Sequence, residues 1–202
     1  MIKHIIFDLG NVLLDQKTVS ADVYFASVLG ISEMDSKTFY ETYHGDAVKG
    51  SVSFVDLVSL YKENFKCDLS KEEIYTRYKQ LYIHDVKSVN IALIELIKRL
   101  KINYSIYMMT NTLQPHFDHW KTLDINHYFN RLFRSDADHF IKPEKESYLY
   151  VVNKIGAKAE ECIFVDDLAI NVRGAKDAGL QGIVYQNNNL LKRDLLKFGV
   201  KI

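Results

Sequence analysis

Four short stretches of this 202-residue chain place polar side chains at or close after apolar runs of the kind that form buried strands. They are Asp8, Thr110-Asn111, Lys142-Pro143 and Asp166-Asp167. A carboxylate of this set can act as a nucleophile toward phosphorus. The hydroxyl and amide groups can hold phosphate oxygens, and the lysine can offset developing negative charge. Together the residue types suit phosphoryl transfer.

The carboxylates of this set also predict a metal. Asp8, Asp166 and Asp167 would repel one another strongly if the fold brought them together. A hard divalent cation with oxygen ligands would relieve that repulsion and could bridge to phosphate. We therefore expect a Mg2+ cofactor.

The elements around these residues predict how they meet. Apolar runs at 2–7, 104–109, 132–135, 162–165 and 181–185 predict strands. Amphipathic stretches at 89–101, 146–155, 170–178 and 190–198 predict helices. This alternation is typical of an α/β fold, a three-layer αβα, doubly wound, Rossmann-like parallel sheet. Because parallel strands end at the same edge, the four polar stretches can share one cleft there.

Residues 17–85 differ in pattern from the rest of the chain. Their apolar positions follow helical spacing, and Ser70 with Glu73 matches a capping box. The glycines of segment 44–50 predict a loop between two helices. We expect an all-helical cap domain at 17–85, inserted after the first strand, and a core domain formed by 1–16 and 86–202.

Bulk composition limits the partners. The chain has 26 basic and 26 acidic residues and a pI of about 7.1, which argues against nucleic acid or an anionic membrane surface as a partner. Its two cysteines show no disulfide or metal-ligand spacing, and no apolar run is long enough to cross a membrane. We expect a cytoplasmic protein that acts on a small phosphorylated metabolite. Its oligomeric state is open.

Taken singly, each motif has a structural explanation. Thr110-Asn111 can form a turn, Lys142 can be solvated, and Asp166-Asp167 can cap a helix. His116, His119 and Trp120 can be a packed helix face or part of a site. Their order and their placement at strand ends are more specific than any one motif.

That order resembles the haloacid dehalogenase superfamily. The matching stretches lie at both ends of the chain: Phe7-Asp8-Leu9-Gly10-Asn11-Val12, Met109-Thr110-Asn111-Thr112, Ile141-Lys142-Pro143-Glu144 and Phe164-Val165-Asp166-Asp167 with the residues up to Ala175. Within the superfamily the chain is most similar to small phosphatases of the α-D-glucose-1-phosphate phosphatase type.

The resemblance implies roles for the polar residues. Asp8 would be the nucleophile that forms an aspartyl-phosphate. Thr110 and Asn111 would bind the transferring phosphoryl group, and Lys142 would neutralise Asp8 and the phosphate.

The resemblance also implies a set of metal ligands. Mg2+ would be held by the carboxylate of Asp8, the backbone carbonyl of Gly10 and the acidic pair. We expect Asp167 to bind directly, and Asp166 to bind through water or to pair with Lys142. Asn171 would support the metal shell.

Gly10 departs from the commoner pattern, because most phosphatases of the superfamily carry an acid two residues after the nucleophile. A backbone carbonyl can bind metal but cannot deliver a proton. A sugar anomeric phosphate, such as a hexose-1-phosphate, would depend less on such an acid. Among the insert residues, His44, Asp46 and Lys49 are candidates to supply the acid or to read the sugar, although a solvated loop is the simpler role for them.

Other readings stay open. A metal-independent 2-haloacid dehalogenase would share the fold, and a degenerate fold of this kind could serve only for binding. A receiver domain of a signalling pair has similar residues in a different order and no place for a helical insert. A dinucleotide-binding domain would need a Gly-x-Gly-x-x-Gly after the first strand, which is absent.

Overall fold

The structure, a computed structural model, describes residues 1–202 and is built on one five-stranded sheet. Its strands lie in the order β5-β4-β1-β6-β7, and all neighbouring pairs are parallel. Their bounds are β1 His4–Phe7, β4 Ser105–Thr110, β5 Arg131–Arg134, β6 Cys162–Asp166 and β7 Gln181–Val184. In the register, Phe7 at the end of β1 pairs with Met108 of β4 and Val165 of β6. The ends of the three central strands therefore meet at one edge of the sheet.

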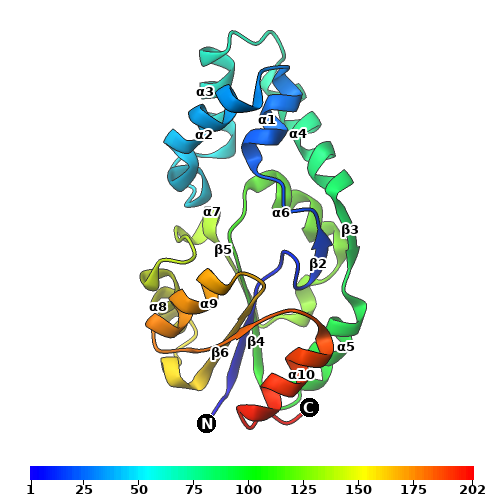
Figure 1. Cartoon of the computed structure of the whole chain (residues 1–202), viewed down its shortest axis with the longest axis vertical. Coiled ribbons are helices and arrows are strands. Elements are labelled where there is room, and N and C mark those ends of the chain that lie inside the picture. The colour runs from blue at the N-terminus through cyan, green and yellow to red at the C-terminus, as the bar shows by residue number, and fades with distance from the viewer.

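Helices cover both faces of this sheet, as three-layer packing requires (Figure 1). Alternate residues of each strand point to opposite faces, so Ile5 and Phe7 join one apolar cluster and Ile6 joins another. The first cluster packs under α5 and α10, and the second under α8 and α9. The bounds of these helices are α5 Ile91–Leu100, α8 Lys145–Lys154, α9 Ala169–Asp177 and α10 Asn188–Lys197. The predicted α/β fold with a parallel sheet is confirmed.

Four helices lie together at one end of the molecule, opposite the end where both termini lie (Figure 1). They are α1 Ala21–Leu29, α2 Glu33–Val48, α3 Phe54–Asn64 and α4 Lys71–Asp85. Aromatic side chains fill the space between them, with the rings of Phe25 and Tyr61 stacked 4.1 Å apart. Ser70 and Glu73 form the predicted capping box at the start of α4. We call residues 17–85 the helical insert; its status as a separate domain stays a prediction.

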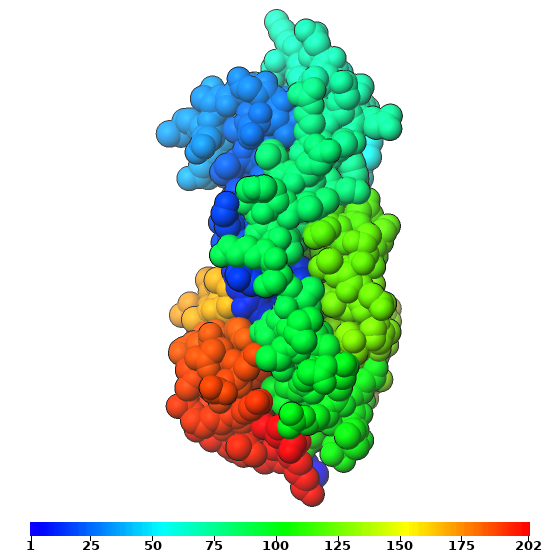
Figure 2. Space-filling model, turned by 90° about the vertical axis from the view of Figure 1, so that its right-hand side faces the viewer, coloured from blue at the N-terminus to red at the C-terminus, as the bar shows by residue number.

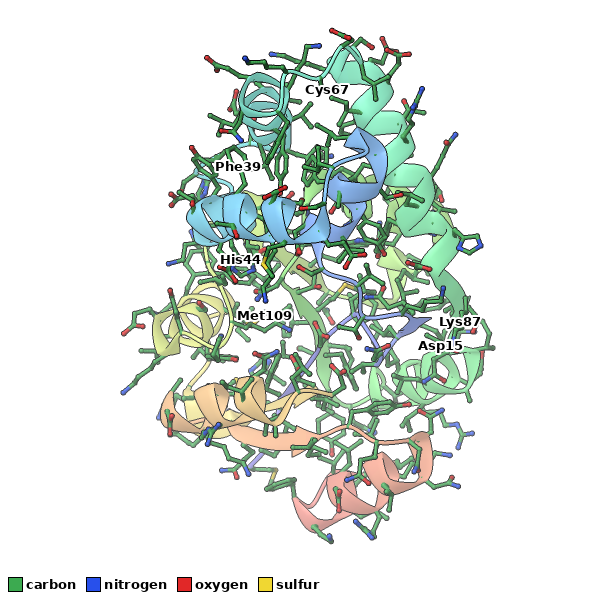
Figure 3. All side chains as sticks on the ribbon, turned by 45° about the horizontal axis from the view of Figure 1, so that its top comes forward. Asp15, Phe39, His44, Cys67, Lys87 and Met109 are labelled. Atoms are coloured by element: carbon green, nitrogen blue, oxygen red, sulfur yellow. The ribbon has the colours of Figure 1, made fainter.

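A two-stranded antiparallel ribbon, which the sequence did not predict, joins the insert to the rest of the chain. It pairs β2 Leu14–Gln16 with β3 Val86–Val89. Asp15 and Lys87 lie close together on it, with 3.8 Å between the carboxylate and the ammonium group (Figure 3). Strands of three and four residues are too short to show a clear alternation, which is why the pattern missed them.

The predicted loop at 44–50 is wrong, because α2 continues through Gly45 to Val48. Ala47 and Val48 are buried, and their burial outweighs the helix-breaking tendency of one glycine. The turn comes later, at Gly50, where φ is +71°.

The remaining elements are short. They are α6 Gln114–Trp120, α7 Ser135–Asp138 and the 3-10 turns Lys121–Leu123, Asn126–Tyr128 and Ala159–Glu161.

None of the helices has the length and apolar character that a membrane span requires. Seen from the side, α4, β3 and α5 form a continuous ridge, green in Figure 2, that links the insert to the sheet.

Candidate active site

A cavity of about 230 Å³ lies at the carboxyl edge of β1, β4 and β6. All seven residues proposed for the site are at this edge, and six of them line the cavity: Asp8, Gly10, Thr110, Asn111, Lys142 and Asp167. The seventh, Asp166, is fully buried directly behind them. The volume lies below the usual range of about 300–1,000 Å³ for ligand pockets, so the cavity suits a small ligand.

Lys142 joins two of the three carboxylates. Its Nζ donates to Oδ1 of Asp8 at 2.6 Å and to Oδ2 of Asp166 at 2.7 Å. Burial alone would lower the pKa of Lys142, but the two carboxylates outweigh it and raise the pKa. The lysine therefore stays charged. Burial raises the pKa of Asp8 to about 7; Lys142 opposes this rise and the Asp166 carboxylate adds to it.

Asp166 and Asp167 have different surroundings. Asp166 accepts hydrogen bonds from Lys142, from the Asn171 amide at 3.0 and 3.1 Å, and from the Leu168 backbone at 2.9 Å. Asp167 is half-buried, faces the cavity and receives one long bond of 3.4 Å from Asn11. Burial and the Asp166 carboxylate raise the pKa of Asp167. Of the pair, Asp167 has the freer oxygens.

Oxygen atoms from the three carboxylates lie within 4.8 Å of one another. Lys142 compensates one of the three negative charges, which leaves two. A hard divalent cation with oxygen ligands fits both the donor set and this charge.

Asn111 binds the backbone of Lys142 with both ends of its side chain. Its Nδ2 donates to the Lys142 carbonyl at 3.0 Å, and its Oδ1 accepts from the Lys142 N–H at 2.9 Å. Asn111 therefore fixes the lysine in addition to any contact with a phosphoryl group. Thr110 is buried at the end of β4 with its hydroxyl within 3.3 Å of the Asn111 carbonyl.

The turn after Asp8 has an unusual backbone. Asn11 has a φ of +53°, and its N–H donates to the Leu14 carbonyl at 2.7 Å. Asparagine tolerates this left-handed conformation better than most residues. The turn brings Gly10 into the lining of the cavity.

The wall of the cavity toward the insert is formed by Gln16, Tyr82 and His116. The sequence suggests His116 as either a packed residue or part of a site, but it gives no indication of Gln16 or Tyr82. Gln16 follows Asp8 by eight positions and reaches it only because β2 folds back, and Tyr82 arrives from α4. No spacing rule would have found either one.

The three insert candidates do not line this cavity. His44 and Asp46 are exposed on α2, where Figure 3 shows the position of His44. Lys49 pairs with Glu144, which immediately precedes α8, at 2.8 Å. Since helix α2 continues through this segment, no loop turns these side chains toward Asp8.

The parallel sheet and the acidic cluster at its strand ends fit the class of hydrolase that the sequence predicts. The model of the haloacid dehalogenase-like hydrolase family matches residues 2–179, so the chain belongs to that family. The predicted superfamily and the predicted hydrolase class are confirmed.

Relatives with known names span nearly the whole chain. D-ribitol-5-phosphate phosphatase of Bacteroides thetaiotaomicron is 23% identical over 208 residues, covering 96% of this chain and 97% of the relative. A solved haloacid dehalogenase-family enzyme from the same organism, in complex with magnesium and inorganic phosphate, has a TM-score of 0.76 and 20% identity, covering 92% of this chain and 95% of that chain. A 2-haloacid dehalogenase from Pseudomonas syringae has a TM-score of 0.65 and 17% identity, covering 92% of this chain and 86% of that one.

Proposed function

We propose that the protein is a Mg2+-dependent phosphatase that hydrolyses a small phosphorylated metabolite through an aspartyl-phosphate on Asp8. One observation carries this proposal. The Asp8 carboxylate lies against Lys142 in a small cavity, with oxygens of Asp166 and Asp167 within 4.8 Å. A nucleophile beside a cation site and a buried ammonium group suits a dianionic phosphoryl group.

Each residue then has a chemical role. Asp8 attacks phosphorus, Lys142 offsets the charge on Asp8 and the phosphoryl oxygens, and the Thr110 hydroxyl donates to one of those oxygens. Asn111 orients Lys142 and can contact the phosphoryl group. Mg2+ would be held by Asp8, Asp167 and the Gly10 carbonyl, with Asp166 and Asn171 behind them, and when bound it would neutralise the phosphoryl charge.

The relatives support a sugar or polyol phosphate as the substrate class. One related protein is named for ribitol 5-phosphate, and one structural neighbour binds magnesium with inorganic phosphate. The cavity of about 230 Å³ suits a small molecule such as a sugar or polyol phosphate. A metal-independent dehalogenase is the competing function, because an enzyme of that name shares the fold.

The decisive experiment compares Asp8→Asn with Asp15→Asn. Asp15 is an exposed aspartate on β2, outside the catalytic cavity, so the control makes the same chemical change on the surface. We expect Asp8→Asn to lower kcat on a panel of sugar and polyol monophosphates by about 10⁴-fold or more, and Asp15→Asn to leave kcat nearly unchanged.

Removal of metal with EDTA should abolish the activity, and added Mg2+ should restore it. Halide release from 2-chloropropionate, measured in parallel with EDTA present, would instead establish the dehalogenase. Phosphatase activity that survives Asp8→Asn would show that the nucleophile is another group.

A further inference from the structure

The amide of Gln16 lies in the space beside the proposed nucleophile. A Cβ atom built on Gly10 would lie 2.9 Å from Nε2 of Gln16 and 3.9 Å from Oδ2 of Asp8. The amide nitrogen and the carboxylate oxygen are therefore both within 4 Å of one point at the cavity wall. A glycine at position 10 leaves this space to Gln16.

Neighbouring aromatic residues fix the direction of the Gln16 side chain. The Tyr82 hydroxyl donates to Oε1 of Gln16 at 3.3 Å, so the amide N–H groups remain for another acceptor. The ring of Tyr82 stacks on His116 with centroids 3.9 Å apart and 18° between the planes. His116 in turn lies 3.3 Å from the hydroxyl of buried Tyr78.

This wall offers hydrogen bonds but no acid. Burial lowers the pKa of His116 to about 3, so the imidazole is neutral. Burial and the nearby Asp8 carboxylate raise the pKa of Tyr82, so the phenol holds its proton and is a poor acid. The other ionisable groups of the cavity, Asp8, Lys142 and Asp167, belong to the nucleophile and the charge cluster behind it.

We propose that the Gln16 amide, held by Tyr82, donates a hydrogen bond to the leaving-group oxygen and makes the enzyme selective for phosphate monoesters with weakly basic leaving groups. This inference rests on the proposed function. As the bond from Asp8 to phosphorus forms, the bond from phosphorus to the ester oxygen breaks. That oxygen keeps the electron pair, is stabilised by the neutral amide, and takes its proton from solvent.

The consequence is a substrate class. A neutral amide stabilises negative charge on oxygen but does not remove it, so a strongly basic alkoxide leaves slowly. Esters of a hemiacetal or phenolic hydroxyl leave readily, which favours sugar phosphates esterified at the anomeric carbon over those at a primary alcohol. Tyr82 comes from the insert and His116 from α6, so the stacking of their rings exists only with the insert packed against α6.

The test measures kcat/KM with Mg2+ for four esters of increasing leaving-group basicity: p-nitrophenyl phosphate, phenyl phosphate, a hexose-1-phosphate and glycerol 3-phosphate. The wild type should show a steep fall along this series. Gln16→Leu should lower kcat/KM about 10- to 100-fold for the hexose-1-phosphate and glycerol 3-phosphate, and less for p-nitrophenyl phosphate.

Gln16→Glu keeps the size of the side chain and supplies an acid at the same place. It should raise the ratio of glycerol 3-phosphate to p-nitrophenyl phosphate hydrolysis by about tenfold or more, because general acids contribute about 10²–10⁴-fold where they can act. Tyr82→Phe should make kcat/KM fall more steeply along the series, as Gln16→Leu does, but to a smaller extent. Tyr43→Phe is the matched control, since Tyr43 also belongs to the insert but lies on α2 outside the cavity, and it should leave the fall in kcat/KM along the series unchanged.

A flat wild-type series, or equal losses on all four esters in Gln16→Leu, overturns the inference while leaving the phosphatase proposal intact. Absence of Mg2+-dependent hydrolysis of every ester, or activity that survives Asp8→Asn, overturns the proposed function and this inference with it.

Discussion

Lys142 is held in place from three directions at the residue scale. Its ammonium group lies between the carboxylates of Asp8 and Asp166, and Asn111 bonds both polar atoms of its backbone. On the remaining side, α9 approaches the chain so closely that a Cβ on Gly174 would lie 2.3 Å from the Pro143 carbonyl oxygen. The position of Lys142 therefore depends on Gly174, a residue without a functional side chain.

We predict that Gly174→Ala displaces the Lys142–Pro143 segment. The added methyl group overlaps a backbone oxygen that cannot move without moving the lysine, so unfolding should become easier by about 1–3 kcal/mol. A shift of about 1 Å in a catalytic group can cost about 10²-fold in rate, so kcat should fall strongly in steady-state assays.

Gly45→Ala is the control, because Gly45 lies inside α2 and a Cβ added there would have no atom within 4 Å. It should stabilise the protein by about 0.5–1 kcal/mol and leave kcat unchanged. Equal kcat values in the two variants would show that the α9 contact does not position Lys142.

Residues at strand ends were predictable, and residues brought in by the insert were not. Asp8, Thr110 and Asp166 end or closely follow apolar runs, and the parallel sheet brings such positions together whatever the loop lengths. Gln16 and Tyr82 reach the cavity through a short ribbon and the orientation of α4, and both depend on tertiary packing. Asn111 is expected from the sequence to bind phosphate, but its bonds to Lys142 can be seen only in three dimensions.

Contacts on two sides hold the insert against the rest of the chain at the scale of the elements. On the α4 side, the Tyr75 hydroxyl bonds Asp118 of α6. On the α2 side, Lys49 pairs with Glu144, and Nδ1 of His139 donates to the Lys49 carbonyl at 2.8 Å. The insert is therefore held beside the cavity that contains Asp8 from two sides.

We predict that Gly50→Ala separates the insert from α7 on the α2 side. Gly50 has a φ of +71°, and a Cβ there would lie 2.0 Å from the Asp136 carbonyl oxygen. The variant should lower kcat/KM by about 10²-fold, because the wall formed by Tyr82 would move away from Asp8. Kinetics on a hexose-1-phosphate and accessibility of the interface to hydrogen exchange would measure the effect.

The control for this prediction is Gly30→Ala. Gly30 has a φ of +68°, so it carries the same backbone cost of about 1–2 kcal/mol, but a Cβ added there would have no atom within 4 Å. If Gly30→Ala lowers kcat/KM as much as Gly50→Ala does, the loss comes from backbone strain and not from opening of the interface.

The sequence predicts a helix boundary correctly where side-chain hydrogen bonds cap the helix, and incorrectly where tertiary packing sets the boundary. The capping box at Ser70 marks the start of α4 because its hydrogen bonds are local. Gly45 suggested a break in the helix, but α2 continues to Val48 because Ala47 and Val48 are buried. The ribbon of β2 and β3 forms because the two segments that connect the insert to the sheet lie side by side. No local sequence pattern predicts that pairing.

At the scale of the whole molecule, the charge cluster of the site lowers the stability of the folded state. Three carboxylates and one lysine lie together in a chain whose 26 acidic and 26 basic residues balance overall. The raised pKa of Asp167 means that the folded state disfavours its charge, through burial and the Asp166 carboxylate. A bound cation would remove this cost, and metal binding would then stabilise the fold.

We predict opposite effects of Asp167→Asn with and without Mg2+. In EDTA at pH 8 the variant should unfold at a higher temperature than the wild type, since it removes a repelled charge worth at most about 1 kcal/mol at this half-exposed site, or about 2–4 °C in a chain of this size. A carboxyl whose folded pKa is raised costs stability above that pKa, and the cost disappears as the pH falls below the unfolded value of 3.8. The gain in Tm should therefore shrink toward pH 4.

With Mg2+ at about 100 times its Kd, the wild type should gain about 2.7 kcal/mol, or roughly 5–10 °C, and should overtake the variant, which loses a direct ligand. Asp15→Asn, measured in parallel by calorimetry, should follow the wild type in both conditions because the exposed Asp15 lies outside the cluster. A variant that responds to Mg2+ as the wild type does would assign direct coordination to Asp166 instead. Asp166→Asn should then lose the Tm gain from Mg2+. Its Tm in EDTA should also fall, because Lys142 and Asn171 would lose the charge of their common partner.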